Sequence, residues 1–255
     1  MATLVFLGTG TSHGVPIIGC KCAVCTSTDP HNKRTRTSAL IEHDGKNILI
    51  DASIDFRQQA LREMINHLDA ILITHGHADH IFGLDEMRRF NVLQGETIAC
   101  FAEEHSLVEL RRVYEYFWNS PQSGGGVPDI RFETINGPFE AAGVKIVPLR
   151  AEHGAVPVTG YRIGSAAYLT DCNEIPDDTL GKIEGIALLV LDGLRWKEHP
   201  THFNLDQAIE QATRIGAERT CFVHMTHDVD HQSTQHRLPK GMALAYDGLR
   251  VEFEI

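Results

Sequence analysis

The chain has 255 residues and a formal net charge of −11, with 42% hydrophobic and 22% charged residues. This is the composition of a globular protein that can bury a sizeable core, and the acidic balance disfavours a broad nucleic-acid-binding face. No apolar run is long enough for a membrane span, and the N-terminus lacks the pattern of a secretory signal. We therefore expect one cytoplasmic domain over residues 1–255.

The first half of the chain alternates short apolar runs with helical patterns. Residues 2–7 predict a strand, and the Gly8-Thr9-Gly10 turn after it lacks the G-x-G-x-x-G of a dinucleotide site. Apolar runs over 36–43 and 47–51 flank Asp44-Gly45 and predict a β-hairpin. The next predicted elements are a helix over 56–68, a strand over 69–74, a helix over 82–90, a strand over 97–102 and a helix over 105–118.

The second half repeats this alternation, so the sequence predicts a mixed α/β fold. Residues 119–129 contain Ser123-Gly124-Gly125-Gly126, which is typical of a surface connection, with a lid over a substrate as the alternative. The predicted elements that follow are strands over 144–149, 159–163, 166–169, 186–191 and 219–223, and a helix over 205–215.

The stretch 71–80 carries the strongest functional signal. Its apolar start predicts a buried strand that delivers metal-competent side chains into one loop. Imidazole nitrogens and carboxylate oxygens suit Zn(II), Mn(II) or Fe(II), and this choice stays open. Ligands so closely spaced cannot all reach one ion, which favours a site with two metals. The four side chains are His75, His77, Asp79 and His80.

Two metals need more ligands than one loop supplies, and three candidates follow predicted strands later in the chain. They are His153, Asp171 and His224. Open α/β sheets expose functional groups at the carboxyl ends of their strands. Each residue alone could equally be a core or surface residue, so the prediction rests on the three together.

The six cysteines divide into a cluster and three isolated residues. Cys20, Cys22 and Cys25 are too close in sequence to join distant elements by disulfides, and their spacing suits thiolates around a soft ion. The others lie in or beside apolar segments and are predicted to be buried, inert thiols. They are Cys100, Cys172 and Cys221.

The T-H-x-H-x-D-H block of residues 74–80 resembles the signature of the metallo-β-lactamase superfamily, and the resemblance spans essentially the whole chain. It implies an αββα sandwich with a dinuclear site on one edge and Asp51 as a supporting acid. The implied ligands are His75, His77 and His153 on one ion, Asp79, His80 and His224 on the other, and Asp171 bridging.

Within that superfamily the chain is most similar to the PhnP-type phosphoribosyl cyclic phosphodiesterases. The matching features are Gly8-Thr9-Gly10 with Gly14-Val15-Pro16, the C-x-C-x-x-C cluster, His224-Met225-Thr226-His227 and Tyr246-Asp247-Gly248. The resemblance implies one structural zinc, held by Cys20, Cys22, Cys25 and His227. A closed tetrahedral site of three thiolates and one imidazole agrees with this, and a reduced, metal-free cluster is the alternative.

The resemblance also assigns a histidine that acts on the reacting phosphate or its leaving group. His202 matches this position, with His199 as a nearby competitor and an exposed loop histidine as the alternative. The hypothesis is hydrolysis of a small cyclic phosphodiester with two divalent metals, Mn or Zn. Asp79 would orient the nucleophile, and His202 would donate a proton.

Three other functions compete with this hypothesis. They are a transfer-RNA 3′ processing endonuclease, a glyoxalase II-type thioesterase, and a non-catalytic binding protein of the PqqB type. The acidic balance and the lack of a long basic arm argue against the endonuclease. The cysteine cluster and the late paired histidines have no role in the thioesterase, and the full ligand set argues against the binding protein. A homodimer is left open.

Overall fold

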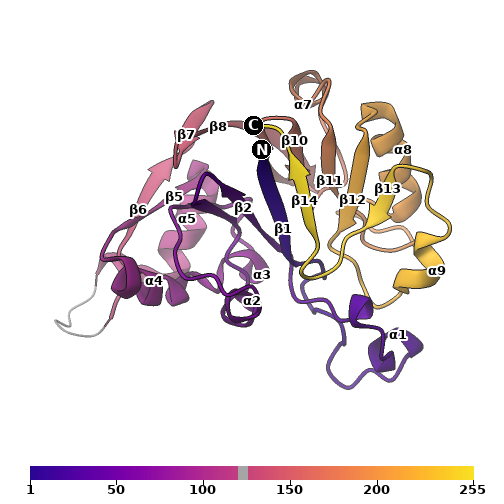
Figure 1. Ribbon diagram of the computed structural model, residues 1–255, viewed down its shortest axis with the longest axis horizontal. Coiled ribbons are helices and arrows are strands. Elements are labelled where there is room, and N and C mark those ends of the chain that lie inside the picture. Colours follow the sequence, from indigo (N-terminus) through magenta and orange to yellow (C-terminus); the bar gives the residue numbers. More distant parts are fainter. Residues whose placement is uncertain (120–125) are drawn as a thin grey trace.

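Two seven-stranded sheets pack face to face in the computed structural model, which describes residues 1–119 and 126–255 (Figure 1). Side chains of both sheets share one buried core between them, including Phe6 and Ile50 from the first and Tyr161 and Val190 from the second. Helices cover the two outer faces, so the molecule is the αββα sandwich that the resemblance implies.

The first sheet comes from the N-terminal half and the extreme C-terminus. Its early strands pair antiparallel, and from β3 onward the pairing is parallel. In spatial order the strands are β14 (Arg250–Phe253), β1 (Ala2–Gly8), β2 (Ser38–His43), β3 (Lys46–Ile50), β4 (Ala70–Leu72), β5 (Ile98–Ala102) and β6 (Ile130–Thr134).

The second sheet is antiparallel at one end and parallel at the other. In spatial order its strands are β13 (Met242–Leu244), β12 (Arg219–Val223), β11 (Leu188–Asp192), β10 (Ala166–Leu169), β9 (Val156–Ile163), β8 (Val144–His153) and β7 (Phe139–Ala141). The carboxyl ends of the parallel strands lie at one edge, where functional groups are expected.

Two further apolar clusters join the helices to the sheets. Short helices of the first half pack on the first sheet, and α7 and α8 pack on the second (Figure 1). The helices are α1 (Ala23–Thr26), α2 (Phe56–Arg62), α3 (Ala78–Ile81), α4 (Met87–Gln94), α5 (Glu104–Val113), α6 (Glu115–Trp118), α7 (Asp177–Lys182), α8 (Leu205–Ile215) and α9 (His231–Gln235), with 3₁₀ turns at Pro30–Asn32 and Leu84–Glu86.

Most predicted strands are confirmed, and the hairpin turn has the expected residues. Asp44 and Gly45 both have positive φ, 46° and 73°, as a tight two-residue hairpin turn requires. The predicted helix over 205–215 is confirmed to the residue as α8. It begins in a capping box, in which Asn204 and Gln207 satisfy each other's backbone N–H groups.

Three predicted helices have the wrong extent. The helix over 56–68 ends at Arg62, because Met64 adopts a left-handed φ of 55°. The helix over 82–90 begins later, after a 3₁₀ turn, and runs to Gln94. The helix over 105–118 is broken at Tyr114, whose φ of −113° and ψ of 41° are not helical.

Four strands were not predicted: β6, β7, β13 and β14. Each has three to five residues, too few for a clear alternation. The lid or surface connection predicted around Ser123 to Gly126 falls mainly on residues 120–125, which lie outside the described part of the chain. Among the residues that are described, no helix is both long and apolar enough to cross a membrane.

Candidate active site and metal centres

Three acidic or imidazole side chains lie at strand ends in an unusual backbone conformation. Asp51 follows β3, Asp171 follows β10 by two residues, and His224 follows β12. Their φ angles are 59°, 56° and 62°, in the left-handed region that costs a non-glycine residue on the order of 1 kcal/mol. Such conformations cluster at functional sites, and here all three turn the chain sharply at one edge of the two sheets.

The loop after β4 contributes the next four side chains. His75 is buried, and His77 precedes the one-turn helix α3, which contains Asp79 and His80. Between the first two histidines, Gly76 is tightly enclosed. A Cβ there would lie 2.6 Å from the Cβ of Glu109, so only glycine lets α5 approach this loop. The helix on the outer face thus holds the loop in place.

Four of the predicted ligands form one compact group: Asp79, His80, Asp171 and His224. One ligand atom of each lies within 4.8 Å of all the others. The Oδ2 atom of Asp171 lies 3.2 Å from His80 Nε2 and 3.1 Å from His224 Nε2. His224 Nε2 lies 3.7 Å from Asp79 Oδ2. These are the residues that the resemblance places around one ion, with Asp171 as the bridge.

The other three predicted ligands lie beside this group. His75 Nε2 is 2.9 Å from His77 Nδ1 and 3.8 Å from Asp171 Oδ2. The rings of His77 and His153 have centroids 5.2 Å apart. His153 Nδ1 donates to the carbonyl of Thr201 at 2.7 Å, which leaves its Nε2 free as an acceptor. The structure therefore gathers all seven residues, with Asp171 between the two groups.

Buried acids make this cluster favourable for positive charge. Burial alone would raise the pKa of Asp171, but the imidazoles of His224 and His80 hold that pKa well below its usual range. Burial would lower the pKa of His80, but Asp171, Asp79 and Asp51 raise it well above normal. His75, which burial dominates, has its pKa lowered. The carboxylates thus favour positive charge on His80, whereas burial disfavours it on His75.

Asp51 forms hydrogen bonds that position His80 within the cluster. His80 Nδ1 donates to its Oδ2 at 2.7 Å, and Thr74 donates through both its backbone N–H and its hydroxyl at 2.8 Å. This fixes the tautomer of His80 so that Nε2 faces Asp171. A carboxylate that orients a ligating histidine is a common support in metal sites. Asp51 therefore sits where the resemblance places a supporting acid.

The donor set fits divalent cations. His224 is 1% exposed. Among the described residues its Nδ1 has no hydrogen-bond partner, and its Nε2 lies near the carboxylates of Asp171 and Asp79 without the geometry of a hydrogen bond. Leaving a buried polar group unpaired costs about 1 to 3 kcal/mol, so a ligand for such a nitrogen is favoured. Imidazole nitrogens and carboxylate oxygens are borderline-to-hard donors suited to zinc, manganese or iron.

His202 lies beside both groups of predicted metal ligands. Its ring stacks on His224 at 4.8 Å between centroids and lies 4.5 Å from the ring of His153. His202 Nδ1 donates to Asp192 Oδ2 at 2.7 Å. Burial lowers the pKa of His202, but the Asp192 carboxylate outweighs this and raises it. The predicted histidine is buried beside the cluster and is not an exposed loop residue.

Asp192 was not among the predicted site residues. It is fully buried at the end of β11, and it also accepts a hydrogen bond from the backbone N–H of Cys172 at 2.9 Å. The signal was present in the sequence, because an acid directly follows the predicted strand over 186–191. The same strand-end reasoning that selected Asp171 applies to it.

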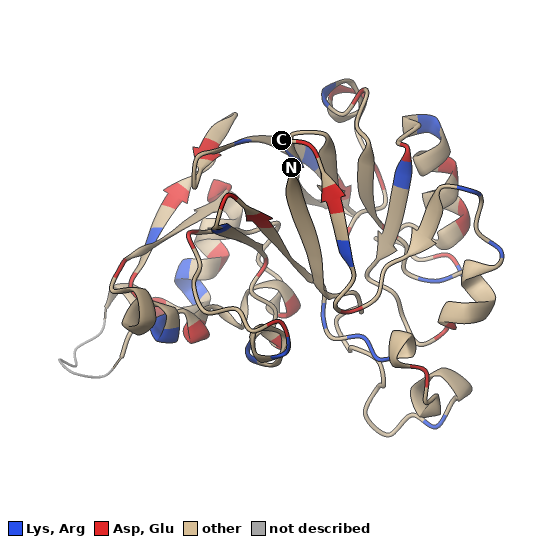
Figure 2. Ribbon diagram, in the orientation of Figure 1, with Lys and Arg blue, Asp and Glu red and all other residues tan. Residues whose placement is uncertain are grey.

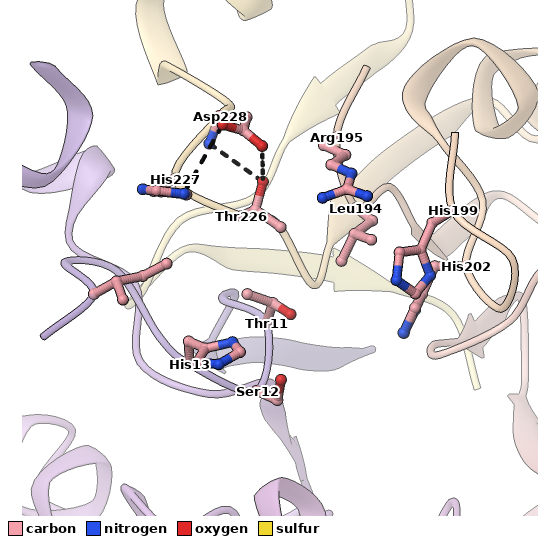
Figure 3. A pocket seen from close by; sticks show the side chains of 11 residues that line it. Thr11, Ser12, His13, Leu194, Arg195, His199, His202, Thr226, His227 and Asp228 are labelled. Atoms are coloured by element: carbon pink, nitrogen blue, oxygen red, sulfur yellow. Dashed lines mark hydrogen bonds and ion pairs between the residues drawn. The ribbon is translucent and has the colours of Figure 1, made fainter. Parts of the chain in front are cut away.

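A cleft of about 330 Å³ opens beside His202 (Figure 3). Its wall combines hydroxyls, imidazoles, one guanidinium and one carboxylate. His199, whose ring centroid is 5.1 Å from that of His202, also faces this cleft. A small polar molecule could enter here and lie beside His202. The polar residues that line it include Thr11, Ser12, His13, Arg195, Thr226 and Asp228.

The cysteine cluster forms a second, separate group. The Sγ atoms of Cys20, Cys22 and Cys25 lie 3.3, 3.5 and 3.5 Å from His227 Nδ1. A tetrahedral zinc site with ordinary Zn–S and Zn–N bond lengths has a sulfur-to-nitrogen edge of about 3.6 Å. The backbone N–H of Cys25 donates to Cys22 and lowers the pKa of that thiol to about 6. The four residues fit a closed zinc site.

The remaining cysteines are buried, as predicted. Burial raises the pKa of Cys221 to about 11 and raises those of Cys100 and Cys172 further. Such thiols carry almost no thiolate at neutral pH and are poor nucleophiles. They are therefore core residues and not part of either cluster.

An αββα sandwich with imidazoles and carboxylates at one sheet edge is the metallo-β-lactamase class of fold. Residues 46–225 match the family model described as the beta-lactamase superfamily domain. The chain is 44% identical to the protein in a crystal structure described as a new diphosphatase from the PhnP family. That match has a TM-score of 0.94 and covers 100% of this chain and 99% of the other. The chain therefore belongs to the beta-lactamase superfamily, and within it to the PhnP family.

Two curated relatives are also similar. A Porphyromonas gingivalis protein named octanoyltransferase is 42% identical over 249 residues, which is 96% of this chain and 50% of that protein. The chain thus spans half of that relative. Coenzyme PQQ synthesis protein B of Methylorubrum populi is 28% identical over 222 residues, covering 74% of this chain and 72% of the relative.

Proposed function

We propose that this protein is a hydrolase, a metal-dependent phosphodiesterase that cleaves a small cyclic phosphodiester. The observation that carries the proposal is the position of His202. It is a buried proton donor that contacts both ligand groups and opens onto a polar cleft. Phosphate chemistry at a dinuclear centre needs positive charge near the phosphoryl oxygens, an acid that protonates the leaving group and room for the substrate.

The seven clustered residues would hold two divalent cations, manganese or zinc. Bound there, the cations lower the pKa of water and neutralise charge on the phosphoryl oxygens. Asp79 would act as a ligand and also as the acceptor that orients the attacking water. Burial raises its pKa, but His80 and His224 outweigh burial and lower the pKa, so this carboxylate is ionised and accepts hydrogen bonds at neutral pH.

His202 would complete the reaction as a general acid. The attacking water, having released one proton to solvent, would form a bond to phosphorus through its oxygen. The bond from phosphorus to the ribose oxygen would break, and the proton on His202 would pass to that departing oxygen. Asp192 holds the ring through Nδ1, so Nε2 carries the transferred proton. By raising the pKa of His202, Asp192 keeps this acid protonated to higher pH.

We also propose that Cys20, Cys22, Cys25 and His227 hold a structural zinc. Three thiolates and one imidazole complete a tetrahedron and leave no open position for a substrate. This cluster would connect the N-terminal loop to the loop after β12. It would fix the wall of the cleft, since His227 also lines that cleft.

A second candidate is hydrolysis of a diphosphate, because the neighbour at 44% identity is described as a diphosphatase. The same centre and the same acid would serve, with a phosphate in place of the ribose oxygen as the leaving group. The name octanoyltransferase does not assign octanoyl transfer to this chain, because the chain matches only half of that relative. Basic residues are scattered among acidic ones along the chain (Figure 2), which fits a small substrate better than a long nucleic acid.

Turnover by metal-defined protein tests the proposal. Purified protein loaded with Mn(II) or Zn(II) is assayed against adenosine 2′,3′-cyclic phosphate, a linear dinucleotide, adenosine diphosphate ribose, a glutathione thioester and precursor transfer RNA. We expect the cyclic phosphodiester to have the highest kcat/KM of these five substrates. Preference for the diphosphate would select the second candidate, and preference for the thioester or the transfer RNA would contradict both.

A further inference from the structure

We infer that an apolar groove on the outer face of the first sheet binds an acidic amphipathic helix of another protein. The groove has a volume of about 380 Å³ and is lined by residues of α2, of α4 and of the segments beside them. Its lining shares no residue with the polar cleft or with either cluster of metal-competent side chains. The inference is therefore independent of the proposed function.

Aromatic and aliphatic side chains make up most of the groove. Phe56 of α2 and Phe90 of α4 are buried and pack together, with ring centroids 5.8 Å apart. Leu61 and Leu93 also line the groove and are 64% and 50% exposed, and Val92, beside Leu93, is 74% exposed. Single exposed apolar side chains are ordinary, but a group of them around a groove is typical of an interaction site.

Two arginines at the groove lack an acid partner. Arg57 of α2 and Arg89 of α4 line the groove and are exposed, and among the described residues neither forms an ion pair. By contrast, Arg62 of α2 and Arg88 of α4 each pair with a carboxylate close in sequence. The lining contains one acid, Glu86, so the groove has an excess of positive charge in a chain of net charge −11.

The distribution of charge selects the occupant. An amphipathic helix presents an apolar stripe with charged residues on both sides, and such helices commonly dock in apolar grooves. Arg57 and Arg89 belong to the two different helices of the groove, so carboxylates on both flanks of the stripe would pair with them. A second copy of this chain fits less well, because a twofold contact at the groove would bring the same arginines against each other.

A matched pair of peptides tests this charge complementarity. One is a helical peptide of about 18 residues with apolar side chains at i, i+3, i+4 and i+7, flanked by glutamates, and the other has lysine in place of each glutamate. Fluorescence anisotropy measures the Kd of each peptide for the whole chain. The variants are the double substitution Arg57→Glu/Arg89→Glu and, as the control, Arg111→Glu, at an exposed position on α5.

We expect the acidic peptide to bind wild type with a Kd on the order of 10 μM, and to bind the double variant at least about 10-fold more weakly. The basic peptide should have the reverse preference, which would also show that the double variant is folded. Arg111→Glu should bind both peptides as wild type does. No binding of the acidic peptide to wild type, or equal binding to wild type and the double variant, would overturn the inference.

Photocrosslinking in the cells that make this protein tests the natural occupant. A benzophenone side chain replaces Val92, one turn after Arg89 on α4, or Val108 on α5 as the control. We expect an adduct from position 92 only, joined to an acidic amphipathic helix of another protein, and lost in Arg57→Glu/Arg89→Glu. An adduct with a second copy, a lipid or a segment without that pattern would overturn the inference, as would the absence of any adduct.

Discussion

The molecule has two clusters of metal-competent side chains, and they differ in donor atoms and access. The first gathers nitrogen and oxygen donors at the ends of strands from both sheets, beside His202, which lines a polar cleft. The second gathers three sulfurs from α1 and the segment before it, and one nitrogen from the loop after β12, at separations that fit one tetrahedron. Sulfur-rich, closed sites are structural, whereas open sites with nitrogen and oxygen donors leave room for a substrate.

The comparison teaches that burial alone does not separate the roles. Cys25 and His75 are both buried, yet only the cluster that contains His75 lies beside an additional proton donor, His202. Removing a residue from the first cluster should abolish activity and leave the fold. Removing one from the second should release zinc and destabilise the protein. The predictions below test that division.

Asp171→Ala should have the largest effect on activity. It removes the carboxylate that lies between both ligand groups, so we expect phosphodiesterase activity to fall on the order of 10⁴-fold or more. Steady-state kinetics together with metal analysis measures this. Asp177→Ala, an exposed acid on α7, is the control and should retain wild-type activity. Full activity in Asp171→Ala would show that Asp171 is not part of the metal centre.

His202→Ala should lower kcat by about 10²- to 10⁴-fold without changing metal content. The reason is loss of the proton donor while all seven proposed ligands remain. His236→Ala, on an exposed position, should behave as wild type. Unchanged turnover with intact metals would show that His202 is not the acid, and His199 would then be the residue to test.

Asp192→Asn should change the pH profile of kcat. The Asp192 carboxylate raises the pKa of His202, and the reaction needs the protonated ring, so activity declines as pH rises through that pKa. Replacing the carboxylate with an amide lowers the pKa, which moves the alkaline limb of the profile to lower pH. A limb that stays in place would show that His202 does not control it.

Cys25→Ser should release one zinc per chain and lower the melting temperature by at least about 5 °C. The nitrogen and oxygen centre should still take up its metals, because the two clusters share no ligand. Cys221→Ala is the matched control, since this buried thiol lies outside both clusters and should leave the zinc content unchanged. Loss of all metals in Cys25→Ser would show that the clusters are not independent.

Asn204→Ala should have the smallest effect. It removes the capping box of α8, which costs about 1 kcal/mol, or roughly 2 to 4 °C in melting temperature. Thermal unfolding measures this change. Activity should change little if α8 only supports the loop that carries His202. A large loss of kcat with an unchanged melting temperature would instead give Asn204 a part in the reaction.

Much of the fold and of the candidate site could be predicted from the sequence. Hydrophobic periodicity indicated the strands and helices, and residues directly after predicted strands indicated the site. The strand-end positions of Asp171 and His224 indicate functional residues from the sequence alone, and the helix at 205–215 was predicted with the bounds that the structure shows. The end of α2 could not be predicted, because it depends on the backbone conformation of Met64.

Two site features required the structure. The pairing of Asp192 with His202 joins residues ten positions apart, whose contact depends on how the loop after β11 folds. The cleft beside His202 is lined by three segments far apart in sequence, around Ser12, Arg195 and Thr226, and their meeting is visible only in the folded chain. A sequence identifies side chains that can do chemistry, whereas the partners that orient or free them emerge from tertiary packing.

Metal titration separates the two clusters in one experiment. Protein that retains only its thiolate-bound zinc is titrated with Mn(II), and hydrolysis of adenosine 2′,3′-cyclic phosphate is followed. We expect no activity at the start and a plateau at about two added equivalents per chain, as a dinuclear centre requires. Full activity before any Mn(II) is added, or none at any occupancy, would contradict a dinuclear phosphodiesterase.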